Sequence, residues 1–328
     1  MPVIRDLFIK LSEIKPINDA SKQMGLKFGA QKVVGGITTN DAIHKIQELN
    51  NKGMSVTFDN LGEFITERAD AEAEKNKIIE MIETARRAGV DAHLSVKLTQ
   101  IGLNIDYDFA LENIREVMKA AKEADMFVNL DMESYPKKVE TMQILDELLK
   151  EYDNVGTVIQ AYLFDSPEDI EKYKDVRLRI VKGAYKEPGS LAYQDKKDID
   201  DSFFELIKAH LTKGKGFTSI ATHDHNIINK VKAFVKENDI DNSKFEFQML
   251  YGFRTEYQQE LIKEGYNFCV YLPYGPDWYA YFMRRIAERP QNINLVIKSF
   301  TTNKKFQAGA IGAASLIGSL FLASKIKG

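Results

Sequence analysis

Eight short runs of β-branched and aromatic residues recur along this chain of 328 residues, and their spacing constrains its fold more than any other feature. Runs of this kind predict buried strands. Stretches with helical spacing and polar faces separate them. Eight strands that alternate with helices predict parallel pairing and closure into an α/β (β/α)8 TIM barrel, with an open doubly wound sheet as the alternative. The predicted strands cover residues 55–58, 93–98, 127–132, 157–162, 177–182, 218–223, 245–250 and 268–272, and the helices between them include residues 69–88, 106–123, 136–151, 199–211 and 226–237.

The two ends of the chain are expected to lie outside the barrel. Residues 1–53 are predicted to form an N-terminal helical extension, with one capped helix at 38–50. The barrel is expected at 54–291, and an apolar C-terminal tail helix at 292–328. Residues 306–324 of this tail are 19 positions without a charge, with lysines on both sides. A helix of that length is about 28 Å long, close to a bilayer core, so the tail is expected either to contact a membrane or to pack on the barrel.

Charge and cysteine content exclude several classes of protein. The chain has 45 basic and 48 acidic residues, a net charge of −3, which disfavours a nucleic-acid binder. Its single cysteine, Cys269, excludes an internal disulfide and a C-x-x-C motif, and a reducing cytoplasm is the expected location. Residues 1–11 are too short and too charged for the apolar core of a signal peptide.

Polar and ionisable residues follow almost every predicted strand. Barrel enzymes build their sites from the carboxyl ends of the strands and from the loops that follow. A single lysine or aspartate at such a position is more often solvated or a helix cap than catalytic. Their repetition around the barrel nevertheless predicts a site at this end. The residues are Lys97, Asp131, Glu133, Gln160, Lys182, Tyr185, His223, His225 and Tyr271.

The predicted last helix, 276–288, carries a second candidate feature. Tyr281, Arg284, Arg285 and Glu288 have the spacing i, i+3, i+4 and i+7 and therefore share one helix face. Two guanidinium groups beside an aromatic ring are suited to bind a small carboxylate. The alternative is a solvated charged face with an Arg285–Glu288 pair.

Common cofactor motifs are absent from the sequence. No G-x-G-x-x-G follows a strand and no Walker sequence occurs, which disfavours a Rossmann or P-loop nucleotide site. His223 and His225 are two residues apart at a strand end and offer a metal pair, which would have to recruit Asp131 or Glu133. A metal-dependent barrel hydrolase using His223 and His225 is therefore one alternative. A scaffold barrel anchored by its tail is another.

Four longer motifs lie in the predicted barrel, and they are RIVKGAY at 179–185, ATH at 221–223, FQMLYG at 247–252 and YLPYGPDWYAYFMRRIAE at 271–288. Together they strongly resemble the proline dehydrogenase family, in its monofunctional bacterial form. The match covers roughly residues 58–291. The resemblance implies a distorted (β/α)8 barrel that binds FAD without a Rossmann motif. It also implies oxidation of L-proline to Δ1-pyrroline-5-carboxylate, the first step of proline catabolism to glutamate, with electrons passed to a membrane quinone.

The resemblance also implies roles for individual residues. Arg284, Arg285 and Lys97 would bind the proline carboxylate. Asp131 and Arg179 resemble the catalytic pair beside flavin and substrate. The ring of proline would be enclosed by Tyr185, Leu250, Tyr271 and Tyr281, with Glu288 closing the pocket. Tyr271 would also be a catalytic residue. FAD would be contacted by Met132, Gln160, Lys182, Gly183, Ala184, Thr222 and His223, and Glu63 resembles a gate residue that pairs with Arg285.

The chemistry of amine oxidation agrees with this assignment. Hydride delivered to the flavin N5 places negative charge near N1, where a cation such as Arg179 stabilises the reduced ring. A clamp on the carboxylate aims one ring carbon at N5, and aromatic walls exclude water. No metal is expected. The expected location is the cytoplasm, with peripheral contact through the tail at the inner face of the cell membrane.

Overall fold

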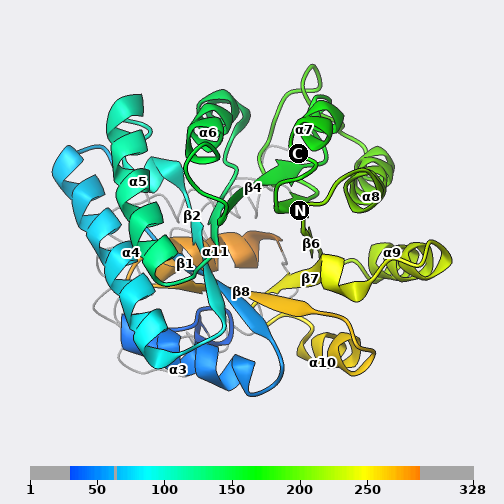
Figure 1. The fold of residues 1–328 in the computed structure, drawn as a ribbon, viewed down its shortest axis with the longest axis horizontal. Helices are drawn as coiled ribbons and strands as arrows, with labels where there is room; N and C mark the ends of the chain where they lie inside the picture. Colours follow the sequence, from blue (N-terminus) through cyan, green and yellow to red (C-terminus); the bar gives the residue numbers. More distant parts are fainter. Residues whose placement is uncertain (1–29, 63–64, 289–328) are drawn as a thin grey trace, which may run out of the picture. The chain divides into compact units, whose positions relative to one another are not determined.

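The computed structural model describes residues 30–62 and 65–288 (Figure 1). Gly35–Pro276 form one compact unit, and the described residues 30–34 and 277–288 belong to a second unit. The second unit contains the short 3-10 helix η1 (Ala30–Lys32) and helix α11 (Trp278–Glu288), which contact each other. The predicted gate residue Glu63 and the predicted tail at 306–324 lie outside the described residues.

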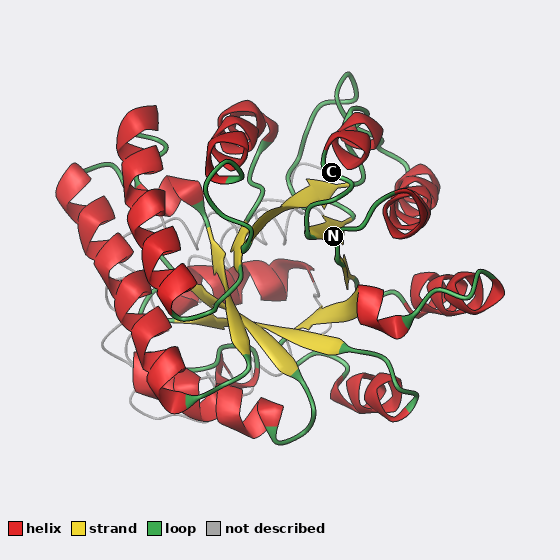
Figure 2. Cartoon of the chain, viewed as in Figure 1, coloured by secondary structure: helices red, strands yellow, loops and turns green. Residues whose placement is uncertain are grey.

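The compact unit is a closed barrel of eight parallel strands in sequential order, with β1 paired to β8. This confirms the predicted TIM barrel and excludes the open sheet. Figure 2 shows the strands at the centre and the helices outside them. The strands are β1 (Ser55–Asn60), β2 (Ala92–Val96), β3 (Val128–Leu130), β4 (Val155–Gln160), β5 (Leu178–Val181), β6 (Thr218–Ala221), β7 (Phe245–Leu250) and β8 (Phe268–Tyr274).

The helices between the strands begin and end close to the predicted positions. Asp106 caps α5 by accepting a hydrogen bond of 2.8 Å from the backbone of Phe109. α4 ends at Gly89, whose φ of 62° suits glycine. The helices are α4 (Arg68–Ala88), α5 (Tyr107–Glu123), α6 (Tyr135–Leu148), α7 (Ser166–Lys172), α8 (Lys196–Lys213), α9 (His225–Glu237) and α10 (Thr255–Lys263), with the 3-10 turns η2 (Leu98–Ile101) and η3 (Asn242–Lys244).

The helix ahead of the first strand, α3 (Thr39–Asn50), packs against the barrel wall. It contacts β1, β8 and α4. Thr38 and Asp41 form a capping box at its start, as the prediction of a capped helix at 38–50 requires. Its buried face includes Ile46, which is fully enclosed. α3 therefore covers the pair of strands at which the barrel closes.

The strands place polar side chains inside the barrel and apolar side chains outside it. Along β2, Leu94 and Val96 belong to the hydrophobic core, whereas Ser95 between them forms hydrogen bonds with side chains of other strands. The same alternation puts Thr57, from β1, opposite Tyr271 of β8. The core thus lies between the strands and the surrounding helices, and the interior is left for polar chemistry.

None of the helices in the described ranges is both long enough and apolar enough to cross a bilayer.

Replacing Ile46 by alanine is predicted to show that α3 is an integral part of the barrel. Loss of this fully buried side chain should lower the free energy of unfolding by about 2–5 kcal/mol. Gln47→Ala, at an exposed position on the same helix, should change it by no more than about 0.5 kcal/mol. Urea denaturation followed by circular dichroism measures both. Equal small effects would mean that α3 is a peripheral extension.

Candidate active site at the carboxyl ends of the strands

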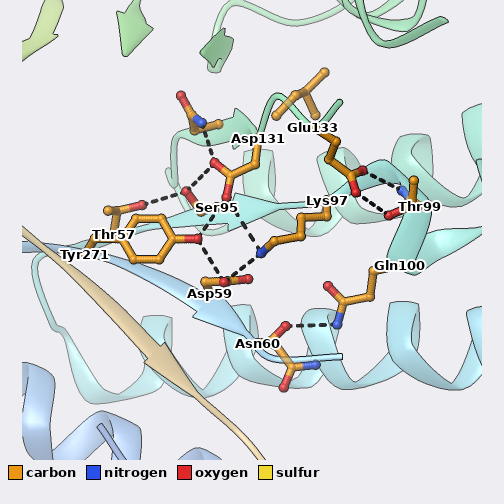
Figure 3. Close-up of polar contacts among 12 residues, drawn as sticks. Thr57, Asp59, Asn60, Ser95, Lys97, Thr99, Gln100, Asp131, Glu133 and Tyr271 are labelled. Carbon is orange, nitrogen blue, oxygen red and sulfur yellow. Dashed lines mark hydrogen bonds and ion pairs between the residues drawn. The ribbon is translucent and has the colours of Figure 1, made fainter. Parts of the chain in front are cut away.

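Two ion pairs joined by a tyrosine hydroxyl lie at the carboxyl ends of the strands. Figure 3 shows four of their five residues, Asp59, Lys97, Asp131 and Tyr271. Lys97 Nζ lies 2.7 Å from Asp59 Oδ2, and Arg179 Nη1 lies 2.7 Å from Asp131 Oδ1. The hydroxyl of Tyr271 is 2.8 Å from Asp59 Oδ2 and 2.9 Å from Asp131 Oδ2. These five side chains therefore form one connected network.

Five strands bring the network together. Asp59 lies in β1, Arg179 in β5 and Tyr271 in β8, while Lys97 and Asp131 directly follow β2 and β3. Because parallel strands in a barrel end at the same rim, residues 38 to 212 positions apart in sequence become hydrogen-bonded neighbours. The prediction that Lys97, Asp131, Arg179 and Tyr271 belong together at this end of the barrel agrees with the geometry.

The guanidinium of Arg179 is held by three further strands. Its Nε donates to Gln248 Oε1 at 2.7 Å, its Nη2 donates to Thr57 Oγ1 at 3.0 Å, and its Nη1 donates to Asp131. Its Cζ lies 5.3 Å from the centre of the Tyr271 ring. With 4% of its surface exposed, Arg179 is a fixed buried charge.

Asp131 accepts hydrogen bonds from four side chains. Ser95 Oγ and Asn129 Nδ2 donate to Oδ1 at 3.1 and 3.0 Å, in addition to the bonds from Arg179 and Tyr271. This set of donors suits a carboxylate, which accepts hydrogen bonds through both oxygens. Asp131 is therefore satisfied by the protein alone.

Asp59 was missing from the sequence prediction. The predicted strand ended at Phe58, whereas β1 continues to Asn60 and turns Asp59 into the barrel. The signal that could have found it is its place at the end of a strand, the same criterion that selected Lys97 and Asp131. Asp59 is 2% exposed, and its Oδ1 has no hydrogen-bond partner among the described residues.

Burial and mutual charge set the ionisation of this network. Burial raises the pKa of Asp59, although the charge of Lys97 opposes the shift, and the nearby Asp131 raises it further. Burial opposes the charge of Lys97, but Asp59 and Asp131 raise its pKa above the ordinary value. Burial and the two carboxyl groups raise the pKa of Tyr271 well above its usual range, so the phenol keeps its proton.

Glu133, another predicted strand-end residue, has a different role. Its carboxylate accepts hydrogen bonds from the backbone and the hydroxyl of Thr99 at 3.2 and 2.7 Å. Thr99 lies in η2, directly after Lys97. Glu133 thus fixes the turn that carries Lys97. Burial raises its pKa, opposed by the bonds from Thr99.

A cavity of about 540 Å³ lies beside the ends of β5 and β6. Lys182 in its wall contacts Asp200 and, at 2.8 Å, Asp224. Partial burial raises the pKa of Asp224, but Lys182 outweighs it and brings the value to about 2. The cavity brings together two of the predicted cofactor-binding residues, Thr222 and His223, with Lys182. It is lined by Lys182, Lys196, Thr222, His223, Asp224, His225, Asn226 and Arg254.

The other predicted cofactor-binding residues lie at the end of β4 or on the loops after β3 and β5. Gly183 has a φ of 112°, and a Cβ there would lie 2.3 Å from the Tyr162 ring, so only glycine fits. Gln160 donates to the backbone of Glu133 at 3.2 Å, and its buried Oε1 has no partner in the described ranges. Met132 is buried, and Ala184 is exposed directly after Gly183.

The predicted substrate-binding residues fall into two groups. Leu250 is partly exposed at the end of β7, and Tyr185 is 41% exposed on the loop after β5. In α11 the guanidinium of Arg285 lies over the Tyr281 ring at 5.2 Å, which confirms that these two residues share a face. Arg284 and Glu288 belong to the same helix, but their side chains lie outside the described part of the chain.

The metal-dependent alternative based on His223 and His225 finds no support. His225 stacks on Tyr257 and meets Arg254 at 2.7 Å, whereas His223 accepts from the backbone of Leu250 at 3.4 Å. Neither histidine belongs to a cluster of three candidate ligands in residues 30–62 and 65–288. The cluster found there is at the amino ends of the strands and consists of His93, Glu246 and Cys269.

Comparison with known proteins places this geometry in a family. The model of the family described as proline dehydrogenase matches residues 42–297. Proline dehydrogenase 2 of Bacillus subtilis strain 168 is 42% identical over 301 residues, which cover 91% of this chain and 99% of that protein. Proline dehydrogenase of Deinococcus radiodurans is 42% identical over 276 residues, covering 82% and 89% of the two chains.

A solved structure shows the same fold. Proline utilization A from Bdellovibrio bacteriovorus, inactivated by N-propargylglycine, matches with a TM-score of 0.74 and 25% identity. The match covers 78% of this chain and 32% of that longer protein. On the strength of the family match and of relatives that align over nearly their whole length, the chain belongs to the proline dehydrogenase family.

Proposed function

We propose that this protein is an FAD-dependent enzyme that oxidises L-proline to Δ1-pyrroline-5-carboxylate and passes the electrons to a quinone. The observation that carries the proposal is the buried network of Asp59, Lys97, Asp131, Arg179 and Tyr271 in a member of this family. A second candidate function has no comparable support.

The lining of the cavity beside β5 and β6 supports the proposed binding of an anionic dinucleotide. Three cations, Lys182, Lys196 and Arg254, and one carboxylate, Asp224, lie in its wall. Asp224 and Asp200 pair with the two lysines, and Arg254 is the further cation for phosphate oxygens. At the end of β4, the unpartnered Oε1 of Gln160 offers an acceptor to an N–H group. The residues that would hold FAD are Met132, Gln160, Lys182, Gly183, Ala184, Thr222 and His223. When bound, FAD supplies the hydride acceptor.

Proline would be oriented through its carboxylate. The proposal assigns that carboxylate to Lys97, Arg284 and Arg285, because charge-assisted hydrogen bonds fix a small anion strongly. Fixing the substrate at one end leaves its ring nitrogen and the adjacent carbon in one position. Apolar and aromatic walls would exclude water from the pocket, and they are formed by Tyr185, Leu250, Tyr271 and Tyr281. Glu288 and the gate residue Glu63 would lie at its entrance.

Arg179 would supply a fixed positive charge where negative charge develops. Its guanidinium is already held by Asp131, Gln248 and Thr57, so it needs no reorganisation during the reaction. Asp131 keeps the guanidinium in place and balances its charge.

The uncharged stretch in the tail supports the proposed electron acceptor and location. A quinone is lipid-soluble, and the uncharged stretch 306–324 is suited to contact a membrane surface. The proposed location is the cytoplasm, with peripheral contact at the inner face of the cell membrane.

Purified protein is expected to be yellow and to lose its flavin absorbance when L-proline is added without an electron acceptor. Arg285→Met should raise the KM for proline about 30-fold or more, because losing one charged partner of a carboxylate costs about 2–5 kcal/mol. Arg86→Met, at an exposed position on α4, is the matched control. Protein that is not bleached by proline at any concentration would refute the proposed function, and an unaltered KM in Arg285→Met would refute the carboxylate clamp.

Replacing Arg179 should separate its structural role from its chemical role. Arg179→Met leaves the carboxylate of Asp131 without its charged partner, and the free energy of unfolding should fall by about 3–5 kcal/mol. Adding Asp131→Asn should recover part of this stability but not the rate of flavin reduction at saturating proline, which should be at least about 100-fold below wild type. Urea denaturation and stopped-flow absorbance measure the two quantities. Recovery of the rate together with the stability would assign Arg179 a structural role only.

Removing the tail after Asn303 should separate catalysis from membrane contact. Flavin content and dye-coupled activity should persist, because every described residue assigned to the site precedes the deletion, while co-sedimentation with vesicles and activity with long-chain quinones should fall. Leu316→Lys with Leu320→Lys keeps the chain length but charges the apolar stretch, and it should reproduce the loss. Should the truncated protein lose FAD while the full chain never sediments with vesicles, the tail is a structural element.

A further inference from the structure

Asp59 stands out in the network because it is incompletely satisfied. Its Oδ2 receives Lys97 Nζ and the hydroxyl of Tyr271, whereas its Oδ1 has no partner among the described residues. The side chain is 2% exposed, so water does not replace the missing partner freely. A buried carboxyl group with one unpartnered oxygen is not fully stabilised as a carboxylate and can take up a proton.

The number of protons shared by Tyr271 and the two carboxyl groups points to the same side chain, Asp59. Tyr271 has one hydroxyl proton, yet its oxygen lies 2.8 and 2.9 Å from two carboxyl oxygens. Asp131 already accepts from Ser95, Asn129 and Arg179, which suits its ionised form. The next proton to enter the chain Asp59–Tyr271–Asp131 therefore belongs on Asp59.

The proposed reaction requires such an acceptor. Proline in water carries a protonated amine, and hydride can leave the neighbouring carbon only when nitrogen has its lone pair free. Of the groups that face Asp59, Lys97 from β2 is already protonated, and Asp131 from β3 is occupied by its donors. Tyr271 from β8 is the group that reaches both the substrate pocket of the proposal and Asp59.

Other titratable groups nearby are engaged elsewhere. Glu74 of α4 interacts with Asn60, Lys77 and Gln100. Glu133 is held by Thr99. Neither forms a hydrogen bond with Asp59 or Tyr271 within the described ranges.

We propose that Asp59 is a positioning residue that holds Lys97 and Tyr271 and, acting through Tyr271, receives the proton that the substrate amine must lose. The inference rests on the proposed oxidation of proline. The N–H bond of the ammonium breaks and its proton passes to the Tyr271 oxygen, while the hydroxyl proton of Tyr271 forms a new O–H bond with Asp59 Oδ2. No electrons are transferred in this step, and the nitrogen keeps the electron pair that later forms the C=N bond.

The test measures flavin reduction by proline across pH in the FAD-loaded full chain. Asp59→Asn keeps the size of the side chain and a hydrogen bond to Tyr271, but it removes the proton acceptor. The amine must then lose its proton to water, so the pH profile of the reduction rate at saturating proline should move at least about one unit to higher pH, which is about tenfold in rate near neutrality. Tyr271→Phe should produce the same shift, and the double variant no further shift.

A second measurement uses an anion that has no amine. Cyclopentanecarboxylate has the shape of proline without the nitrogen, and its binding is followed through the flavin spectrum. Asp59→Asn releases Lys97 from its negative partner, so this probe should bind about threefold or more tightly. General damage to the site would weaken the binding of the probe, which is the opposite of the expected change in affinity. Glu83→Gln, which removes an exposed carboxylate on α4, should leave the position of the pH profile unchanged.

Each outcome decides one question. A wild-type flavin that proline does not reduce at any pH refutes the proposed function. A reducible wild type, with Asp59→Asn slowed by the same factor at every pH or shifted to lower pH, overturns the role of Asp59. A shift in Asp59→Asn without one in Tyr271→Phe also overturns it, because the path runs through the hydroxyl. If Asp59→Asn fails to bind FAD, the profile of Tyr271→Phe decides alone.

Discussion

The guanidinium of Arg179 is the interaction on which the interior of this barrel depends. Its three nitrogens reach Thr57 on β1, Asp131 after β3 and Gln248 on β7, so one side chain on β5 links four parts of the wall. A charge that is 4% exposed is stable only when each donor has an acceptor. Asp131 and Tyr271 both contact this guanidinium, Asp131 through a hydrogen bond and Tyr271 through the face of its ring.

A second buried pair of an arginine and a carboxylate lies in the barrel interior, nearer the amino ends of the strands. Arg177 Nη2 lies 2.9 Å from Glu246 Oε1, and the guanidinium lies between the rings of Phe127 and Phe217. Ser219 donates to the same Glu246 oxygen at 2.7 Å. These residues lie near the amino ends of the strands, where conserved chemistry is rare in barrels and stability is the usual role. The interior therefore holds two layers of paired charges. Among the described residues, Asp59 Oδ1 in the upper layer and Arg177 Nε in the lower layer have no hydrogen-bond partner.

The sequence predicted all eight strands but not where each one ends. The last strand was predicted to stop at residue 272, which put Tyr271 next to its end. In the structure β8 continues through Pro273 to Tyr274, and Tyr271 lies inside the barrel wall beside Thr57. Asp59 was missed for a related reason. A single sequence shows neither where a strand ends nor how it is aligned with its neighbours. Contacts between strands 38 or more residues apart, such as Lys97 with Asp59, follow from register alone.

The charges of the network explain why it would need help to bind an anion. Lys97 and Arg179 are each paired with a carboxylate, Asp59 and Asp131, so the formal charges of the four groups cancel. A neutral cluster exerts little net attraction on a carboxylate from outside. Two further cations, as proposed for Arg284 and Arg285, would supply the missing charge. Protonation of Asp59 would add to this positive charge, because the charge of Lys97 would then no longer be balanced by a carboxylate. The proton that leaves the substrate amine would therefore strengthen the binding of the carboxylate at the other end of the same substrate molecule.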